Sequence, residues 1–358
     1  MINFIIEYFY PEIGGLEKST ERLAIELTKK GYKINIITKL LEGTKEKEIY
    51  KGITIYRFCD DYILNCSKTS LFKDANINCV FGVGHKKDHN VWKPIFDAKK
   101  PTFIKIGTSG DIIDKGIPLE YFKGFKAILC QNDNLVEETE KLNIKGLHGL
   151  IIKNGLDIKE WQNNLMNKTE CRKLYNLLDD EFVISAVGRF VIRKNFPLII
   201  KSIYRLKKEK KIENITILLH GSDFGQHDGE EKEIKELVKK LNMNVLFIEP
   251  NKPVCNTLRA SDVFITMGSR EGAPNIIIEA MATGLPIIAS NISGHDVYVT
   301  NNGFLVNFDE ADICKHIYLL YSNRQMLKDF GQNSLNNVLE FDISKTSELY
   351  LDIFKRWW

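Results

Sequence analysis

Two glutamates, Glu271 and Glu279, stand eight residues apart in the sequence TMGSREGAPNIIIEAMATGLPIIAS, residues 266–290. The pattern predicts a strand end, a loop, a helix from about Pro274 to just before Gly284, and a new strand. Pro274 suits the first turn of a helix, and Gly284 suits the left-handed position just past its end. Short apolar runs on both sides are typical of buried parallel strands. The segment therefore predicts a βαβ unit.

A helix that starts at the carboxyl edge of a parallel sheet can bind an anion through its first N–H groups and the positive end of its dipole. We expect residues 272–277 to face a phosphate for this reason. Glu271 would lie in the loop beside that phosphate, and Glu279 would lie over a turn further on. Each carboxylate could accept hydrogen bonds from hydroxyls on one side of a diphosphate, as a sugar nucleotide requires. The alternative is that Glu271 is a solvated loop charge and that Glu279 pairs locally.

Two basic residues, Arg189 and Lys194, bracket a loop after a predicted strand at residues 182–187. A guanidinium fork and a compact ammonium could clamp a diphosphate and balance the charge on a leaving group. Basic loop residues are usually solvent charges when they occur alone. A phosphate site predicted independently on a neighbouring strand favours the clamp.

Two adjacent glycines, Gly14 and Gly15, lie between a predicted strand at residues 2–6 and a helix that ends at Lys30-Gly31. A ligand can approach such a backbone closely because no Cβ blocks it, although a tight turn would also use two glycines. The G-x-G-x-x-G pattern of dinucleotide-binding folds is missing here, which disfavours an oxidoreductase.

A polar loop follows the predicted strand at residues 102–106 and contains Thr108, Ser109 and Asp111. These side chains could bind hydroxyls of a substrate, but a plain turn fits the sequence as well. His85 and His89, four residues apart, suggest a metal site, but a solvated loop is favoured because no helical stripe accompanies them.

The composition is that of an ordinary globular protein, with 358 residues, 44% hydrophobic and 27% charged residues and a formal net charge of +3. This charge is too small to indicate nucleic-acid binding. Seven cysteines without a Cys-x-x-Cys pair favour reduced thiols over disulfides or zinc. Without a signal peptide or an apolar run long enough to span a bilayer, we expect a cytoplasmic protein.

Strand and helix patterns alternate along the whole chain, which predicts an α/β protein with two tandem Rossmann-like, doubly wound domains and a cleft between them. The predicted domains span residues 1–155 and 156–340; the family resemblance given below implies that the first is the acceptor-side domain and the second the nucleotide-sugar domain. Residues 341–358 would form a helix that packs back on the first domain.

These motifs, in this order, resemble the retaining glycosyltransferases of the GT-B fold, in particular glycosyltransferase family 4. The resemblance rests on the Gly14-Gly15 loop, the Asn154-Gly155-Leu156-Asp157 turn, Gly188-Arg189 with Lys194-Asn195, Ala260-Ser261-Asp262-Val263, the Glu271-x7-Glu279 pair, and Asn302-Gly303-Phe304-Leu305-Val306. Many relatives carry a histidine where this sequence has Gly107, so the acceptor side is not assigned by the resemblance.

The resemblance implies roles for individual residues. Arg189 and Lys194 would bind the donor diphosphate, Glu271 the sugar hydroxyls and Glu279 the ribose; Gly272, Ala273, Asn275 and Ile276 would meet the phosphates, and Gly14 and Gly15 would close over them. Catalysis would rest on Glu271, Arg189 and Lys194.

The implied function is transfer of a hexose from a nucleoside diphosphate sugar, with UDP as the expected nucleotide, to a hydroxyl of a surface-glycan or lipid-linked acceptor, with retention. No cofactor and no metal are expected, since no Asp-x-Asp occurs in the chain. Two alternatives stay open: a catalytically silent nucleotide-sugar-binding subunit, and a GT-B epimerase or phosphorylase.

The segment from Lys345 to Trp358 places Leu349, Ile353 and Phe354 on one helical stripe, followed by Lys355-Arg356 and Trp357-Trp358. Packing on the first domain is favoured, because the helix also carries acidic residues. The competing prediction is peripheral contact of the tryptophans with the inner surface of the cytoplasmic membrane.

Overall fold

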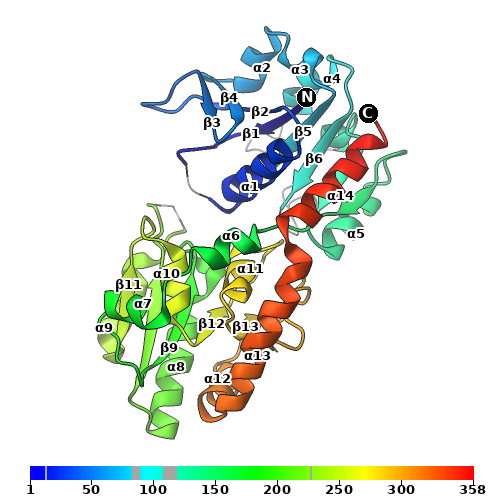
Figure 1. Ribbon diagram of the computed structural model, residues 1–358. Helices are drawn as coiled ribbons and strands as arrows, with labels where there is room; N and C mark the ends of the chain where they lie inside the picture. Colours follow the sequence, from blue (N-terminus) through cyan, green and yellow to red (C-terminus); the bar gives the residue numbers. More distant parts are fainter. Residues whose placement is uncertain (13, 83–88, 108–118, 226–227) are drawn as a thin grey trace. The chain divides into compact units, whose positions relative to one another are not determined.

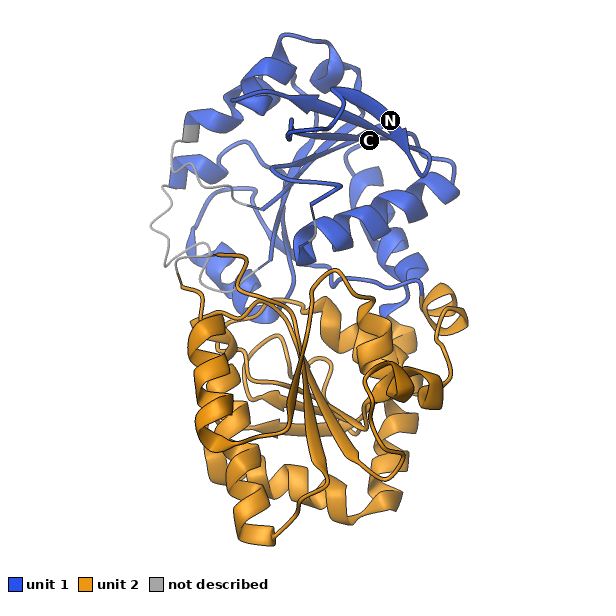
Figure 2. Ribbon diagram, turned by 90° about the vertical axis from the view of Figure 1, so that its left-hand side faces the viewer, with its two compact units in different colours: residues 1–157, 341–358 blue, residues 158–340 orange. Residues whose placement is uncertain are grey.

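The computed structural model describes residues 1–12, 14–82, 89–107, 119–225 and 228–358. The chain forms two compact units, of which unit 1 comprises residues 1–157 and 341–358 and unit 2 comprises residues 158–340 (Figures 1 and 2). Each unit contains one β-sheet with helices on both faces. This is the two-domain, mainly parallel α/β architecture that the sequence predicts.

Unit 1 contains an eight-stranded sheet in the order β3-β4-β2-β1-β5-β6-β7-β8. All neighbours are parallel except β3 and β4. The strands are β1 (Ile2–Ile6), β2 (Ile34–Lys39), β3 (Lys47–Tyr50), β4 (Ile53–Phe58), β5 (Ile77–Phe81), β6 (Thr102–Ile106), β7 (Ile128–Cys130) and β8 (Gly149–Ile151).

The helices of unit 1 are α1 (Gly15–Lys29), α2 (Tyr62–Ser67), α3 (Leu71–Asp74), α4 (Lys93–Phe96), α5 (Asp133–Lys141) and α14 (Ile343–Lys355), with 3-10 turns at His89–Trp92 and Leu119–Phe122. The central strand β1 is buried on both faces, as the apolar run INFII predicts. One face packs in a core with α1 and α14, and the other packs in a separate core that includes α2 and α5.

Unit 2 contains a six-stranded, fully parallel sheet in the order β11-β10-β9-β12-β13-β14. Its strands are β9 (Phe182–Val187), β10 (Ile215–His220), β11 (Val245–Ile248), β12 (Val263–Thr266), β13 (Ile287–Ser290) and β14 (Gly303–Val306). Because parallel strands all end at one edge, the loops after β9, β12 and β13 come together there.

The helices of unit 2 are α6 (Ile158–Asn163), α7 (Lys168–Leu174), α8 (Phe196–Lys210), α9 (Glu231–Leu241), α10 (Val254–Ala260), α11 (Asn275–Ala282), α12 (Glu310–Ser322) and α13 (Arg324–Asn337), with 3-10 turns at Ile192–Lys194 and Val338–Phe341. The helix α11 begins one residue after Pro274, and Gly284 has the expected positive φ of 80°. No described helix is both long and apolar enough to cross a bilayer.

Candidate active site

The loop after β9 begins with a close approach of two backbones. Gly188 and Gly221, which follow β9 and β10, both have positive φ values, of 149° and 146°. A Cβ on Gly221 would lie only 2.0 Å from the Gly188 carbonyl oxygen. A side chain at Gly221 would therefore push the loop that carries Lys194 out of position.

This loop is tied to the loop after β12 by two hydrogen bonds. Asn195, with a left-handed φ of 54°, donates from Nδ2 to the carbonyl oxygen of Met267 at 2.8 Å. The amide of Ser269 donates to the carbonyl oxygen of Arg193, also at 2.8 Å. The left-handed turn at Asn195 thus fixes the basic residues beside the segment that carries Glu271.

A charge cluster of Lys194, Arg193 and Glu271 results. Lys194 Nζ lies 2.5 Å from Glu271 Oε1, and Arg193 Nη1 lies 3.3 Å from the same oxygen. The Glu271 and Lys194 side chains are only 11% and 12% exposed, whereas that of Arg193 is 36% exposed. Burial alone would raise the pKa of Glu271, but the charges of Lys194 and Arg193 outweigh it and hold this pKa below its usual range.

The carboxylate of Glu271 fits its place because Gly268 has no side chain. A Cβ on Gly268 would lie 2.7 Å from Glu271 Oε1. On the other side of this loop, a Cβ on Gly294 would lie 2.4 Å from the Gly272 carbonyl oxygen, and Gly294 has a φ of 98°. The Glu271 segment therefore packs closely on itself at Gly268 and against the loop after β13 at Gly294.

A buried histidine on the loop after β13 completes this packing. The hydroxyl of Ser290 donates to the carbonyl oxygen of Gly268 at 2.6 Å, and His295 Nδ1 lies 3.0 Å from the Ser290 carbonyl oxygen. Since that carbonyl can only accept, Nδ1 carries the proton. Burial lowers the pKa of His295, and although the nearby Glu271 opposes this shift, the imidazole is favoured in its neutral form.

The N-terminus of α11 follows Glu271 directly. Pro274 precedes the first helical residue, has no N–H, and provides no side-chain cap. Backbone amides at the start of a helix, here at Asn275 and Ile276, point out along the helix axis toward its positive end and suit an anion. Glu279 lies further along α11 and is only 4% exposed.

The remaining predicted residues are placed as follows. Arg189 is exposed and forms no ion pair with any described residue, whereas Arg193, which sequence reasoning missed, lies beside Glu271. Its position next to Lys194 made it a candidate, but the sequence does not show which of these basic residues faces Glu271. Gly14 and Gly15 lie at the start of α1 in unit 1. Thr108, Ser109 and Asp111 lie outside the described residues.

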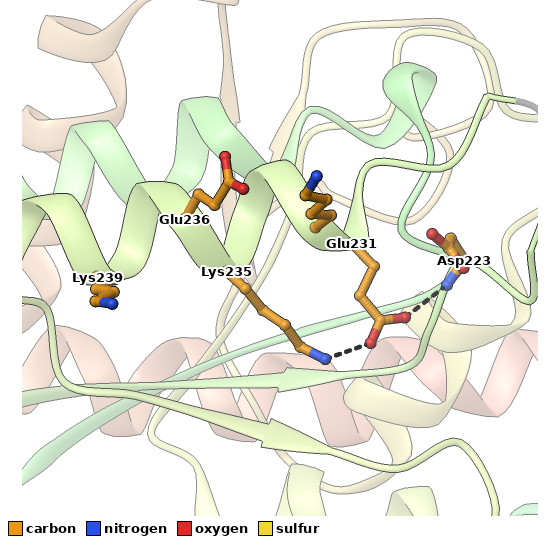
Figure 3. Close-up of a pocket in the computed structure, with 6 residues that line it drawn as sticks. Asp223, Glu231, Lys235, Glu236 and Lys239 are labelled. Atoms are coloured by element: carbon orange, nitrogen blue, oxygen red, sulfur yellow. Dashed lines mark hydrogen bonds and ion pairs between the residues drawn. The ribbon is translucent and has the colours of Figure 1, made fainter.

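Among the described residues, no group of three His, Cys, Asp or Glu side chains is arranged to hold a metal ion. A hollow of about 460 Å³ lies beside α9 and is lined by Asp223 and five charged residues of that helix. As Figure 3 shows, Glu231 accepts hydrogen bonds there from Lys235 Nζ at 2.7 Å and from the backbone amide of Asp223 at 3.2 Å. It contains none of the predicted site residues, and we regard it as a solvated helix face.

A model of a known protein family matches most of unit 2. Residues 167–336 match the family model of glycosyl transferases group 1. This matched segment covers slightly less than half of the chain. It contains the whole cluster of Lys194, Arg193 and Glu271 together with α11.

Curated relatives cover part of the chain. The UDP-Gal:alpha-D-GlcNAc-diphosphoundecaprenol alpha-1,3-galactosyltransferase of Escherichia coli is 28% identical over 211 residues, which are 57% of this chain and 54% of that protein. The capsular polysaccharide biosynthesis glycosyltransferase CapM of Staphylococcus aureus is 28% identical over 249 residues, 63% of this chain and 64% of that protein. The chain thus spans only about half to two thirds of these relatives.

Solved structures match the complete fold. The structure of Anabaena HepE in complex with UDP and glucose superposes with a TM-score of 0.81 at 14% sequence identity and covers 99% of both chains. At this identity the match concerns the fold alone. The chain has the GT-B fold, as the sequence predicts.

Proposed function

We propose that this protein is a retaining glycosyltransferase, of the family 4 type, which moves a hexose from a nucleoside diphosphate sugar to a hydroxyl group. UDP is the proposed nucleotide, and a surface glycan or a lipid-linked glycan is the proposed acceptor. The observation that carries the proposal is the ion-paired cluster of Lys194, Arg193 and Glu271 beside the start of α11, inside the segment that matches the family model of glycosyl transferases group 1. The relatives named for galactosyl transfer and capsule synthesis support the choice of acceptor class.

Binding of the donor would replace the carboxylate of Glu271 with a diphosphate as the partner of the basic residues. In the cluster, Lys194 and Arg193 share the single carboxylate of Glu271, which leaves one positive charge in excess. A diphosphate at the start of α11 would take over these cations, with Arg189 as a further partner, and release the carboxylate to accept hydrogen bonds from the sugar hydroxyls. Glu279 would hold the ribose.

Charge on the departing diphosphate must be neutralised as the glycosidic bond breaks. Lys194, Arg193 and the dipole of α11 are suited to this role, because they are held in place before the reaction begins. No metal ion or cofactor is needed in this scheme. The leaving phosphate would take the acceptor proton on the face it leaves, which retains the anomeric configuration.

A transfer assay tests the proposal. The protein is incubated with UDP-glucose or UDP-galactose and a lipid-linked glycan extract, in EDTA, and the anomeric proton of the product is examined by NMR. We expect an α-linked product from these α-linked donors. An inverted product would contradict retention, and activity that is lost in EDTA and restored by Mg²⁺ would contradict metal independence. Donor binding without transfer to any acceptor would indicate a silent subunit, and an isomerised donor would indicate an epimerase.

A further inference from the structure

The helix α14 and the two tryptophans that follow it have different environments. Tyr350 and Phe354 are fully buried in the core of unit 1, and Leu351 is nearly so. Trp357 and Trp358, by contrast, remain 42% and 49% exposed. The predicted packing on the first domain is therefore correct for the helix. The two tryptophans after it remain about half exposed.

The indoles lie at the amino-terminal edge of the unit 1 sheet. The Trp358 ring is 5.8 Å from that of Tyr32, which lies just before β2, and Lys126 Nζ, just before β7, is 5.2 Å from the Trp357 ring centroid. Figures 1 and 2 both show the two chain ends at this side of unit 1. In unit 1, this is the edge opposite the loop of Gly14 and Gly15, which follows the carboxyl end of β1.

Basic residues neighbour the indoles: Lys126 lies over the Trp357 ring, Lys355 and Arg356 precede Trp357 in the chain, and Lys33 follows Tyr32. Lys33, Lys126, Lys355 and Arg356 are all exposed, and none of them forms an ion pair with a described carboxylate. Of the two acidic residues on α14, Glu348 is already paired with Lys30 at 2.9 Å, which leaves only Asp352. The four basic side chains near the tryptophans therefore outnumber Asp352, the acidic residue of α14 that forms no ion pair with any described residue.

We infer that this basic–aromatic patch, formed by Lys33, Lys126, Lys355, Arg356, Trp357 and Trp358, docks on an anionic lipid surface. Indoles with an apolar body and a polar N–H favour the boundary between lipid and water. Unpaired lysines and arginines are attracted to anionic headgroups. Insertion of the indoles and electrostatic attraction of the basic residues are each weak, but together they support reversible, peripheral attachment.

This inference goes beyond the proposed transfer reaction and does not depend on it. Vesicle binding is measured without donor or acceptor, so failure of the docking would leave the transferase proposal unaffected, and the reverse also holds. If both are correct, the patch would bring the protein to the surface that displays a lipid-linked acceptor.

The test is sedimentation of the full chain with vesicles of phosphatidylcholine containing phosphatidylglycerol, and with vesicles of phosphatidylcholine alone. We expect binding to the anionic vesicles only, and weaker binding at high salt. The double variant Lys126→Gln/Arg356→Gln should bind roughly thirtyfold more weakly, since each basic residue contributes on the order of 1 kcal/mol near such a surface. The double variant Trp357→Ser/Trp358→Ser should also lose binding.

Matched controls come from unit 2. Phe308→Ser removes an aromatic side chain that is 45% exposed, and Lys239→Gln/Lys240→Gln removes two exposed charges at the end of α9. Neither control should change vesicle binding. Melting temperatures are recorded for every variant. Unchanged vesicle binding by the tryptophan variant, with a lowered melting temperature, would overturn the inference and assign the indoles to packing alone. Equal loss in the controls would show non-specific adsorption and would overturn it as well.

Discussion

The ion pair between Lys194 and Glu271 should be the most sensitive point of the candidate site. The change Lys194→Met removes the ammonium that lies 2.5 Å from Glu271 Oε1 and leaves the carboxylate with Arg193 at 3.3 Å. In the donor complex it would remove one charge-assisted contact to the diphosphate, worth about 1.5–3 kcal/mol, which corresponds to roughly ten- to 150-fold in kcat/KM. We expect the loss mainly in kcat, because charge on the leaving group is greatest in the transition state.

The same variant should also lose stability. Breaking a buried ion pair by removing one partner costs about 3–5 kcal/mol when the remaining charge is left alone. Glu271 keeps Arg193 and is 11% exposed, so we expect a smaller loss, on the order of 1–3 kcal/mol. Urea unfolding of Lys194→Met, Glu271→Gln and the double variant gives the coupling energy of the pair, which should be about 1–2 kcal/mol.

Lys201→Met is the matched control, because Lys201 is an exposed lysine on the neighbouring helix α8. It should change neither kcat/KM nor stability measurably. A coupling energy close to zero between Lys194 and Glu271, together with unchanged kinetics of Lys194→Met, would refute the cluster as the donor site.

Other outcomes follow from the same structure. Arg189→Ala should lower kcat by about ten- to a hundredfold, because it removes one contact to the donor diphosphate; donor turnover measures this change. The pKa of Glu271 is lower in the folded protein than in the unfolded chain. Its contribution to stability is therefore fully present above the unfolded pKa and is lost as the pH falls through the folded pKa. In acid, the free energy of urea unfolding should thus depend less on pH for Glu271→Gln than for the wild type. Burial lowers the pKa of Lys105 to about 8, so the stability of the wild type relative to Lys105→Met should rise from about pH 8 toward pH 10.5, and Lys105→Met should be the more stable protein at pH 7. Gly294→Ala should cost more than about 1 kcal/mol in thermal unfolding and weaken donor binding, because its Cβ would lie 2.4 Å from the Gly272 carbonyl oxygen.

The sequence predicted those features that depend on local pattern. Apolar runs such as residues 2–6 and 182–187 are strands buried on both faces. The ends of α11, predicted from Pro274 and Gly284, are correct to within one residue. The edge strand β3 was missed, because KEIY alternates exposed and half-buried residues and has no continuous apolar run. Local pattern thus identifies central strands better than edge strands.

The site was predictable only in part. Lys194 and Glu271 were identified as candidates, but their direct contact depends on Asn195 and Ser269, whose hydrogen bonds join two loops far apart in the sequence. The place of Arg193 depends on the same tertiary contact. No pattern of spacing reports which of several neighbouring basic residues turns toward a carboxylate, since that is decided by the turn and its cross-loop bonds.

The central claim, that the cluster in unit 2 binds a nucleoside diphosphate sugar, is tested most directly by thermal shift with UDP, UDP-glucose, UDP-galactose, GDP-mannose and NAD, each on the wild type and on Lys194→Met. A ligand at one hundred times its Kd should stabilise the folded state by about 2.7 kcal/mol. We predict stabilisation of the wild type by a nucleoside diphosphate or its sugar, and a much smaller shift for Lys194→Met. Stabilisation by NAD and by none of the nucleoside diphosphates, or an equal shift in both proteins, would contradict the claim.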